Sequence, residues 1–286
     1  MKLELKTLRY RMFNNLASAI IKVLGGVYFG LGSLFADGLH TFSDFVTDIV
    51  SMIGSKISKK RPTKYHPFGF GKVEYLSNLF VGFLLFALGI FIIINGLTGK
   101  REIPPLSVLF LLVITFVLKL LAIVKMHKVG KEINSTVLIT SVEESKADLY
   151  STIGVFIITI ILQFSNKIPI FGYADMIGSI IIGLIVLKTT FKIIISNSLS
   201  VIGEIDYDKE KIEQVKEVLN KYKKVLDSDV KLIMYGSYYK LQLTVVLDQN
   251  LTLRQAEQLL KRIKSDIVRK KNLKIKHVTI FIADNL

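Results

Sequence analysis

Six long apolar segments fill the first two-thirds of this chain and constrain its fold more than any other feature. Each has about the 20 mainly apolar residues that an α-helix needs to cross a bilayer. The mean hydropathy of +0.48 and the hydrophobic content of 51% are too high for an ordinary soluble domain of 286 residues. The sequence therefore predicts an α-helical membrane protein with six transmembrane helices. The expected spans cover residues 12–30, 34–57, 74–98, 105–125, 137–163 and 174–198.

The composition changes after about Gly203, where hydropathy falls and charge rises. Two segments then repeat apolar residues at helical spacing, and three alternate apolar and polar residues as strands do. Their order, αββαβ, is that of a small α+β ferredoxin-like sandwich that lacks its first strand. We therefore expect a membrane domain over residues 1–203 and a cytoplasmic C-terminal domain over residues 204–286. The expected elements are helices at 208–222 and 252–270, and strands at 230–235, 238–247 and 275–282.

Basic residues gather in two connections between the apolar segments. The first holds five lysine and arginine residues between positions 59 and 72, and the second holds three between positions 125 and 131. The connections on the other side carry little positive charge beyond Lys100, Arg101 and Lys167. The positive-inside rule then places both termini in the cytoplasm of a multi-pass cell-membrane protein. The same distribution accounts for the net charge of +15 without nucleic-acid binding.

The second apolar segment contains a stripe of ionisable side chains. His40, Asp44 and Asp48 follow one another at intervals of four residues, so they share one face of a helix, and Asp37 lies near its edge. Ionisable groups inside a membrane span are energetically costly and mark candidate functional sites. The alternative is a helix end that reaches the lipid headgroups, which the apolar sequence on both sides of the stripe disfavours.

The fifth apolar segment repeats this spacing with Glu144 and Asp148. Together with His40 and Asp44 they offer one imidazole and three carboxylates, a ligand set suited to a divalent transition metal. The chain has no cysteine, so thiolate ligands are excluded. The sequence therefore predicts a metal site made of His40, Asp44, Glu144 and Asp148.

A structural alternative is a buried salt-bridge network that needs no metal. In that interpretation Lys22 or Lys146 neutralises carboxylates in these spans. Lys146 points to a different side of its helix from Glu144 and Asp148, where it can pair with Glu143.

Two motifs, one of which contains His40 and Asp44, resemble those of the cation diffusion facilitators. Residues 32–44, Gly-Ser-Leu-Phe-Ala-Asp-Gly-Leu-His-x-x-x-Asp, resemble the second-helix signature of that family. Residues 66–74, His-Pro-Phe-Gly-Phe-Gly-Lys-Val-Glu, resemble its loop His-x-Phe-Gly-x-Gly-Lys-x-Glu. Ser135-x-x-Leu138 and Asp175, at the starts of the fifth and sixth spans, fit as well. The resemblance extends over nearly the whole chain.

The resemblance implies a homodimer that exports divalent metals, commonly Zn²⁺, from the cytoplasm in exchange for protons. The metal is then a transported substrate, and no cofactor is expected. Glu144 stands where the family usually has His or Asp in its fifth helix, which shifts the site toward oxygen ligands. We therefore expect Zn²⁺ export by proton antiport with alternating access, with relaxed metal discrimination and with His40 as the group for which metal and protons compete. The alternative is a broader Mn²⁺, Fe²⁺ and Co²⁺ exporter of the same family.

Some members of the family bind additional metal ions, and the matching positions here argue against such sites. Near the loop, Thr63 and Phe70 replace the expected acidic residue and histidine. In the C-terminal domain the expected histidines are replaced at four positions, so we expect that domain to dimerise without metal. These positions are Lys231, Thr244, Glu257 and Phe281. The residues left without an assigned metal role are Asp48, Glu143, His66, His277 and Asp284.

Two other functions would use the same residues. An intramembrane metalloenzyme needs a base or nucleophile beside an open metal position, and the sequence has no His-Glu-x-x-His motif to supply it. A metal sensor that signals through its soluble domain is disfavoured because the expected ligands lie in the membrane. We therefore expect a transporter and not an enzyme.

Overall fold

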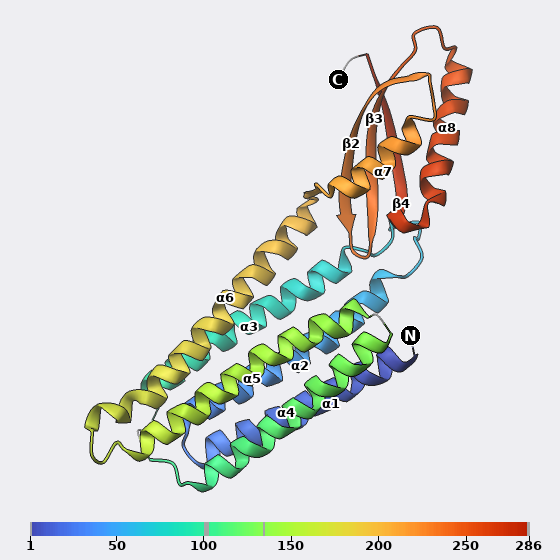
Figure 1. The fold of residues 1–286 in the computed structure, drawn as a ribbon. Helices are drawn as coiled ribbons and strands as arrows, with labels where there is room; N and C mark the ends of the chain where they lie inside the picture. Colours follow the sequence, from blue (N-terminus) through green and yellow to red (C-terminus); the bar gives the residue numbers. More distant parts are fainter. Residues whose placement is uncertain (1, 100–102, 134, 285–286) are drawn as a thin grey trace. The chain divides into compact units, whose positions relative to one another are not determined.

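The computed structural model describes residues 2–99, 103–133 and 135–284; Lys100 and Arg101, which entered the charge argument, lie outside these ranges. Six long helices are followed by a smaller α+β domain, which confirms the predicted fold class (Figure 1). The chain forms two compact units. The first contains Met1–Val50 and Phe80–Ile193, and the second contains Ser51–Leu79 and Ile194–Leu286.

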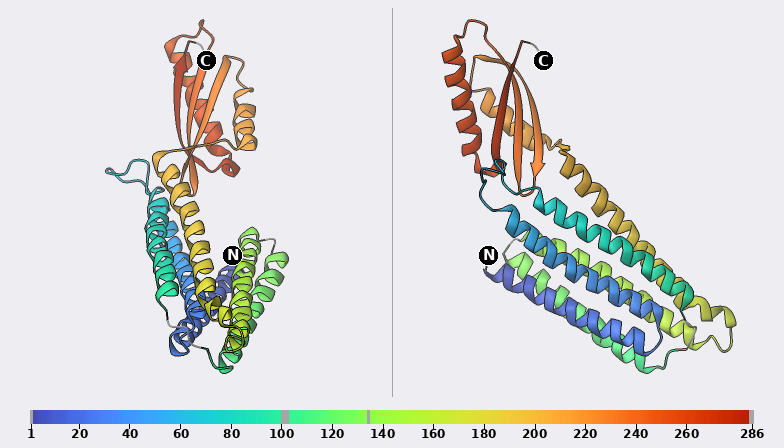
Figure 2. Two further views of the ribbon diagram at one scale, coloured as in Figure 1. Left: turned by 90° about the vertical axis from the view of Figure 1, so that its left-hand side faces the viewer. Right: turned by 180° about the vertical axis from the view of Figure 1, so that it is seen from behind.

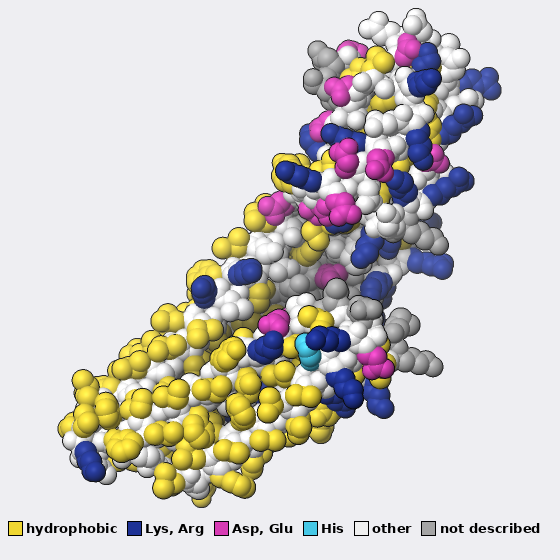
Figure 3. Space-filling model, in the orientation of Figure 1, with side chains coloured by type: hydrophobic (Ala, Val, Ile, Leu, Met, Phe, Trp, Pro, Cys, Tyr) yellow, Lys and Arg dark blue, Asp and Glu magenta, His cyan; other side chains and the backbone are white. Residues whose placement is uncertain are grey.

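Each of the six long helices has the length that a bilayer requires. They are α1 (Lys2–Tyr28), α2 (Gly32–Ser58), α3 (Val73–Thr98), α4 (Ser107–Glu132), α5 (Thr136–Gln163) and α6 (Ala174–Ile202). At about 1.5 Å per residue they are about 40 Å long, against about 30 Å for the hydrocarbon core. Within the described ranges, α3, α4, α5 and the stretch ending with α6 are also apolar enough to cross a membrane, while α1 and α2 carry more ionisable side chains. Hydrophobic side chains cover most of the visible surface of the long helices (Figure 3).

Two helices extend beyond their apolar segments. α1 begins at Lys2, and α4 continues to Glu132. Lys125, Lys128 and Lys131 were expected in a loop, but they lie on the last two turns of α4. Lysine is a good helix former, so a helix does not have to end where hydropathy falls.

The first unit has an apolar core and a close contact between α1 and α2. A Cβ atom added at Gly38 would lie 2.6 Å from the backbone nitrogen of Val23, so the two backbones meet there. This approach brings Lys22 of α1 beside Asp37 of α2. The core lies nearer the end at which α2 begins and contains Leu31, Leu34, Ile92, Val108, Leu112, Val155, Leu162, Ile182 and Val186.

The C-terminal domain packs two helices against a sheet of four strands in the order β1-β2-β3-β4 (Figure 2). β2 and β3 form an antiparallel hairpin that turns at Gly236, whose φ of +68° favours glycine. Thr252 is the N-cap of α8, and it forms a capping box with Gln255. The elements are β1 (Ile205–Asp206), α7 (Lys209–Leu219), β2 (Val225–Tyr235), β3 (Tyr238–Leu247), α8 (Leu253–Arg269) and β4 (Ile275–Ala283).

The sheet lacks the strand that a complete ferredoxin-like sandwich has between β3 and β4. These two strands pair directly and in parallel, with Leu241 opposite Val278. The short strand β1 lies at the opposite edge, where Ile205 pairs with Ile233 of β2, so it does not fill that position. β1 was not predicted because two residues are too few for an alternating pattern.

Candidate metal site

Three of the four predicted ligands lie together inside the first unit. His40 and Asp44 are one turn apart on α2, and Asp148 faces them from α5. One ligand atom from each residue lies within 4.8 Å of the others. The Nε2 atom of His40 is 3.8 Å from Oδ1 of Asp148, and the two side chains are 18% and 12% exposed. One imidazole and two carboxylates at this spacing can hold a divalent metal and leave further coordination positions for water or another side chain.

The fourth predicted ligand, Glu144, lies outside this group. Its side chain is 61% exposed, and its Oε2 atom accepts a hydrogen bond of 2.9 Å from Nη1 of Arg11 on α1. The other terminal nitrogen of Arg11 donates to both carboxylate oxygens of Asp48, also at 2.9 Å. The guanidinium therefore connects α1, α2 and α5 and holds Glu144 one turn away from Asp148.

A second basic side chain, Lys119 of α4, contacts the candidate site directly. Its Nζ atom lies 2.6 Å from Oδ2 of Asp148 and donates a hydrogen bond of 3.0 Å to Oδ1 of Asn15. The lysine side chain is 2% exposed. The two oxygens of Asp148 thus face different partners, with Oδ2 toward Lys119 and Oδ1 toward His40.

A third basic side chain forms a buried ion pair further along the bundle. Nζ of Lys22 lies 2.7 Å from Oδ2 of Asp37 and donates to the hydroxyl of Thr152 at 2.8 Å. The other oxygen of Asp37 has no hydrogen-bond partner among the described residues. Lys22 therefore neutralises a carboxylate of α2, as the salt-bridge interpretation expected, but that carboxylate is Asp37 and not a candidate ligand.

The polar residues form three successive levels along α1, α2 and α5. Arg11 pairs with Asp48 at the first level, the candidate ligands form the second, and Lys22 pairs with Asp37 at the third. Exposure is greatest at the first level and falls to 2% or less for Lys22 and Asp37. The candidate ligands therefore lie between a more exposed ionic contact and a fully buried one.

Sequence reasoning did not find Arg11 or Lys119. Lys119 could have been singled out as a candidate functional residue, because it is a lone ionisable residue in the middle of an apolar segment. Arg11 could not have been singled out, because it lies in the charged N-terminal stretch, where the positive-inside rule already accounts for a basic residue.

The remaining residues considered from the sequence lie elsewhere. Glu143 pairs with Lys146 at 2.8 Å, as expected. The Nδ1 atom of His66 lies 3.3 Å from the hydroxyl of Thr63. The pKa of His277 is lowered, mainly by partial burial and also by the positive charges of nearby lysines. Within the described ranges, the His40 group is the one cluster of at least three histidine and acidic side chains with metal-ligand spacing.

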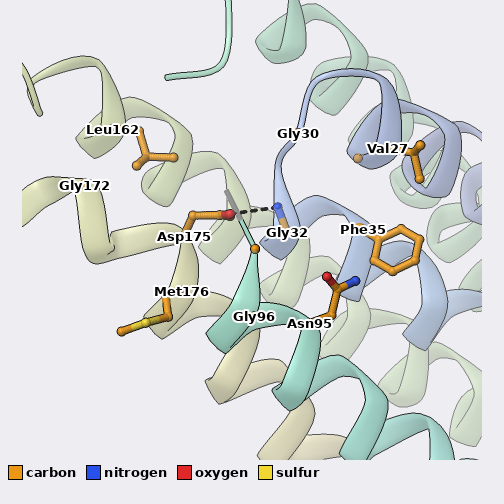
Figure 4. A pocket seen from close by; sticks show the side chains of 12 residues that line it. Val27, Gly30, Gly32, Phe35, Asn95, Gly96, Leu162, Gly172, Asp175 and Met176 are labelled. Atoms are coloured by element: carbon orange, nitrogen blue, oxygen red, sulfur yellow. Dashed lines mark hydrogen bonds between the residues drawn. The ribbon is translucent and has the colours of Figure 1, made fainter. Parts of the chain in front are cut away.

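Asp175 has a structural role at the end of the bundle where α2 begins. A cavity of about 260 Å³ lies there, and half of its lining residues are glycines, which come from α1, the α1–α2 connection, the start of α2, the end region of α3 and the turn before α6 (Figure 4). The carboxylate of Asp175 accepts hydrogen bonds of 2.7 Å from the backbone N–H groups of Gly32 and Ser33. It thereby satisfies free donors at the first turn of α2, the helix that carries His40 and Asp44.

Comparison with known proteins identifies the family. Residues 8–202 match the family model of the cation efflux transmembrane domain, and residues 207–282 match that of the cation efflux protein cytoplasmic domain. The chain belongs to the cation efflux family. These proteins are the cation diffusion facilitators that the sequence motifs indicated, and they are membrane transporters of metal cations. The metalloenzyme alternative is therefore excluded.

Several relatives of this cation efflux protein match along almost their full length. The manganese efflux system protein MneP of Bacillus subtilis is 31% identical over 89% of each chain. MneS, a second manganese efflux system protein of that organism, is 24% identical over 92% of this chain and 90% of its own. An uncharacterized transporter of Methanocaldococcus jannaschii is 29% identical over 98% of both chains.

Proposed function

We propose that this cation efflux protein exports divalent transition-metal ions from the cytoplasm and that His40, Asp44 and Asp148 bind the ion in transit. The observation that carries the proposal is the meeting of their ligand atoms within 4.8 Å inside a bundle of membrane-length helices. Ionisable side chains that converge from two such helices are the usual form of an ion site in a transporter.

Titration of the purified protein with Mn²⁺ tests this ligand set. Asp44→Ala and Asp148→Ala should each lose Mn²⁺ binding, because two protein ligands hold a divalent ion poorly. Glu143→Gln is the matched control, since Glu143 is an exposed carboxylate on α5 that pairs with Lys146 outside the group. Mn²⁺ binding by both alanine variants at the wild-type affinity would refute the assignment.

We propose Mn²⁺ as a principal substrate, with Zn²⁺ as a competitor for the same site. The histidine nitrogen and the general affinity order of divalent metals favour Zn²⁺, which was the expectation from the sequence. Two carboxylates beside one imidazole suit Mn²⁺ better than a histidine-rich site would. The names of MneP and MneS, both manganese efflux proteins, support the same choice.

Proton antiport by alternating access is the proposed driving mechanism. Imidazole and carboxylate bind metal only when they are deprotonated, so protons and metal compete for one site. Protons that enter from the outside would then displace the metal outward when the site opens to that face. The three polar levels support this proposal, because the site has a more exposed side and a buried side.

We further propose that both termini are cytoplasmic, that residues 1–203 form the transport domain and that residues 204–286 form a dimerisation domain. The basic connection between α2 and α3 supports the orientation. Because the chain has no cysteine of its own, single cysteines introduced by mutation can report the orientation of the protein in the membrane directly. In intact cells, a membrane-impermeant thiol reagent should label Lys167→Cys and leave Lys64→Cys unlabelled, and the reverse pattern would contradict the orientation.

A further inference from the structure

Lys119 is a buried positive charge beside a candidate ligand of a divalent cation, an arrangement that requires an explanation. Its ammonium group contacts Asp148 at 2.6 Å and Asn15 at 3.0 Å, and its side chain is 2% exposed. A lysine in the middle of a membrane-length apolar helix carries a large desolvation cost. A residue that served packing alone would be apolar at this position.

The geometry allows Lys119 and a metal ion to contact Asp148 at the same time. The lysine uses Oδ2, while Oδ1 is the oxygen that faces His40. A cation held by His40, Asp44 and Asp148 can therefore bind on the Oδ1 side without displacing the ammonium. Asn15, itself buried, accepts a hydrogen bond from Lys119 and keeps the ammonium at Asp148.

We propose that Lys119 is a fixed counter-charge of the transport site that lowers its affinity for divalent cations and so permits release. This inference rests on the proposed function. With neutral His40, the two carboxylates contribute two negative charges, and Lys119 cancels one of them. A divalent ion in the site is also repelled by the ammonium in surroundings that screen charge less than water does. A transport site must bind an ion firmly enough to select it and weakly enough to release it.

Lys119 also accounts for the stability of the site between transport cycles. Without a metal, Asp44 and Asp148 face each other across a few ångströms. The ammonium offsets part of their repulsion and holds Asp148 in place, so the ligands remain together for the next ion. A counter-charge on α4 therefore serves both the empty and the loaded state.

Mn²⁺ titration of the purified full-length protein at one fixed pH tests the inference. Lys119→Gln removes the charge and keeps an N–H donor toward Asp148. It should bind Mn²⁺ about tenfold more tightly than the wild type, a change of about 1.4 kcal/mol, and should release the ion more slowly in a transport assay. Lys119→Arg keeps the charge and should bind Mn²⁺ close to the wild-type affinity. Unchanged or weaker binding by a folded Lys119→Gln protein would overturn the inference.

A second variant leaves Lys119 in place, so the test does not depend on the folding of Lys119→Gln. Asn15→Asp puts a carboxylate against the ammonium, which offsets its charge, and this variant should also bind Mn²⁺ more tightly. Unchanged affinity in Asn15→Asp would count against the inference in the same way. Failure of the proposed function looks different, because Asp44→Ala and Asp148→Ala would then bind Mn²⁺ as the wild type does. If those two variants lose binding while Lys119→Gln and Asn15→Asp match the wild type, the counter-charge role alone is wrong.

Discussion

The ammonium of Lys22 lies 2.7 Å from the carboxylate of Asp37, and the two side chains are 2% and 0% exposed. This ion pair joins α1 to α2 beside Gly38, one of the places where the two helix backbones approach closely. Thr152 of α5 accepts a hydrogen bond from the same ammonium, so three helices meet at one buried charge pair. The contact fixes the bundle next to the candidate metal site on its less exposed side.

Removing one partner of this pair should destabilise the protein strongly. Asp37→Ala leaves the charge of Lys22 buried and uncompensated, at a cost of about 3–5 kcal/mol, which should appear as a lower thermal unfolding temperature in detergent. Joint replacement by Lys22→Met and Asp37→Leu should recover much of the loss, because no charge remains buried. Glu143→Gln breaks an exposed ion pair on α5 and should change the unfolding temperature little. Equal effects of Asp37→Ala and Glu143→Gln would contradict this account.

Glu144 lies outside the ligand group in this structure, and Glu144→His should sharpen the preference for Zn²⁺ over Mn²⁺ if the side chain at this position reaches the ion during transport. The variant adds a nitrogen donor on the face of α5 that carries Asp148 and removes the carboxylate that Arg11 holds. Transport rates for the two metals in the same vesicles measure the effect. If the Zn²⁺ to Mn²⁺ ratio stays the same while transport persists, Glu144 is not a ligand and its role is limited to the contact with Arg11.

Metal affinity should fall as the solution becomes more acidic. Protons and the metal compete for the lone pairs of the ligands, so lowering the pH from about 8 to about 6 should leave less Mn²⁺ bound. The sign follows from mass action: more protons leave less metal bound. Mn²⁺ titrations across this range measure the change, and an affinity independent of pH would remove the basis for proton antiport.

The C-terminal domain should dimerise without metal. Residues 204–286 contain a complete hydrophobic core of their own, including Leu232, Leu241 and Ile263, each fully buried. Light scattering on this fragment should give a dimer in the presence of a chelator. Stoichiometric, tight Zn²⁺ binding by the fragment would contradict the prediction, which follows from the replacement of the expected histidines.

The local parts of this structure could be predicted from the sequence. The turn-spaced pair His40 and Asp44 shares a helix face by the period of the α-helix alone, and the alternation in 238–247 predicts β3 with its observed bounds. Contacts between helices could not be predicted in this way. Glu144 and Asp148 have the same spacing on α5, but Glu144 meets Arg11 of α1, and that contact depends on how the helices pack.

Lys119 illustrates the same limit within the candidate site. The sequence shows a lysine inside an apolar segment, which is a signal of function, but gives no partner for it. The partner follows from the packing of α4 against α1 and α5, which brings Asn15 and Asp148 to the same ammonium. Charge pairs between segments that are distant in the sequence are therefore the part of the site that can be identified only from the three-dimensional structure.

Mn²⁺ flux into proteoliposomes under an imposed proton gradient tests the central claim most directly. Wild-type protein and Glu143→Gln should carry Mn²⁺ at similar rates, and reversing the gradient should reverse the direction of net flux. Asp44→Ala and Asp148→Ala, reconstituted in equal amounts, should carry none above the background of empty vesicles. Transport at the wild-type rate by either alanine variant would contradict the account.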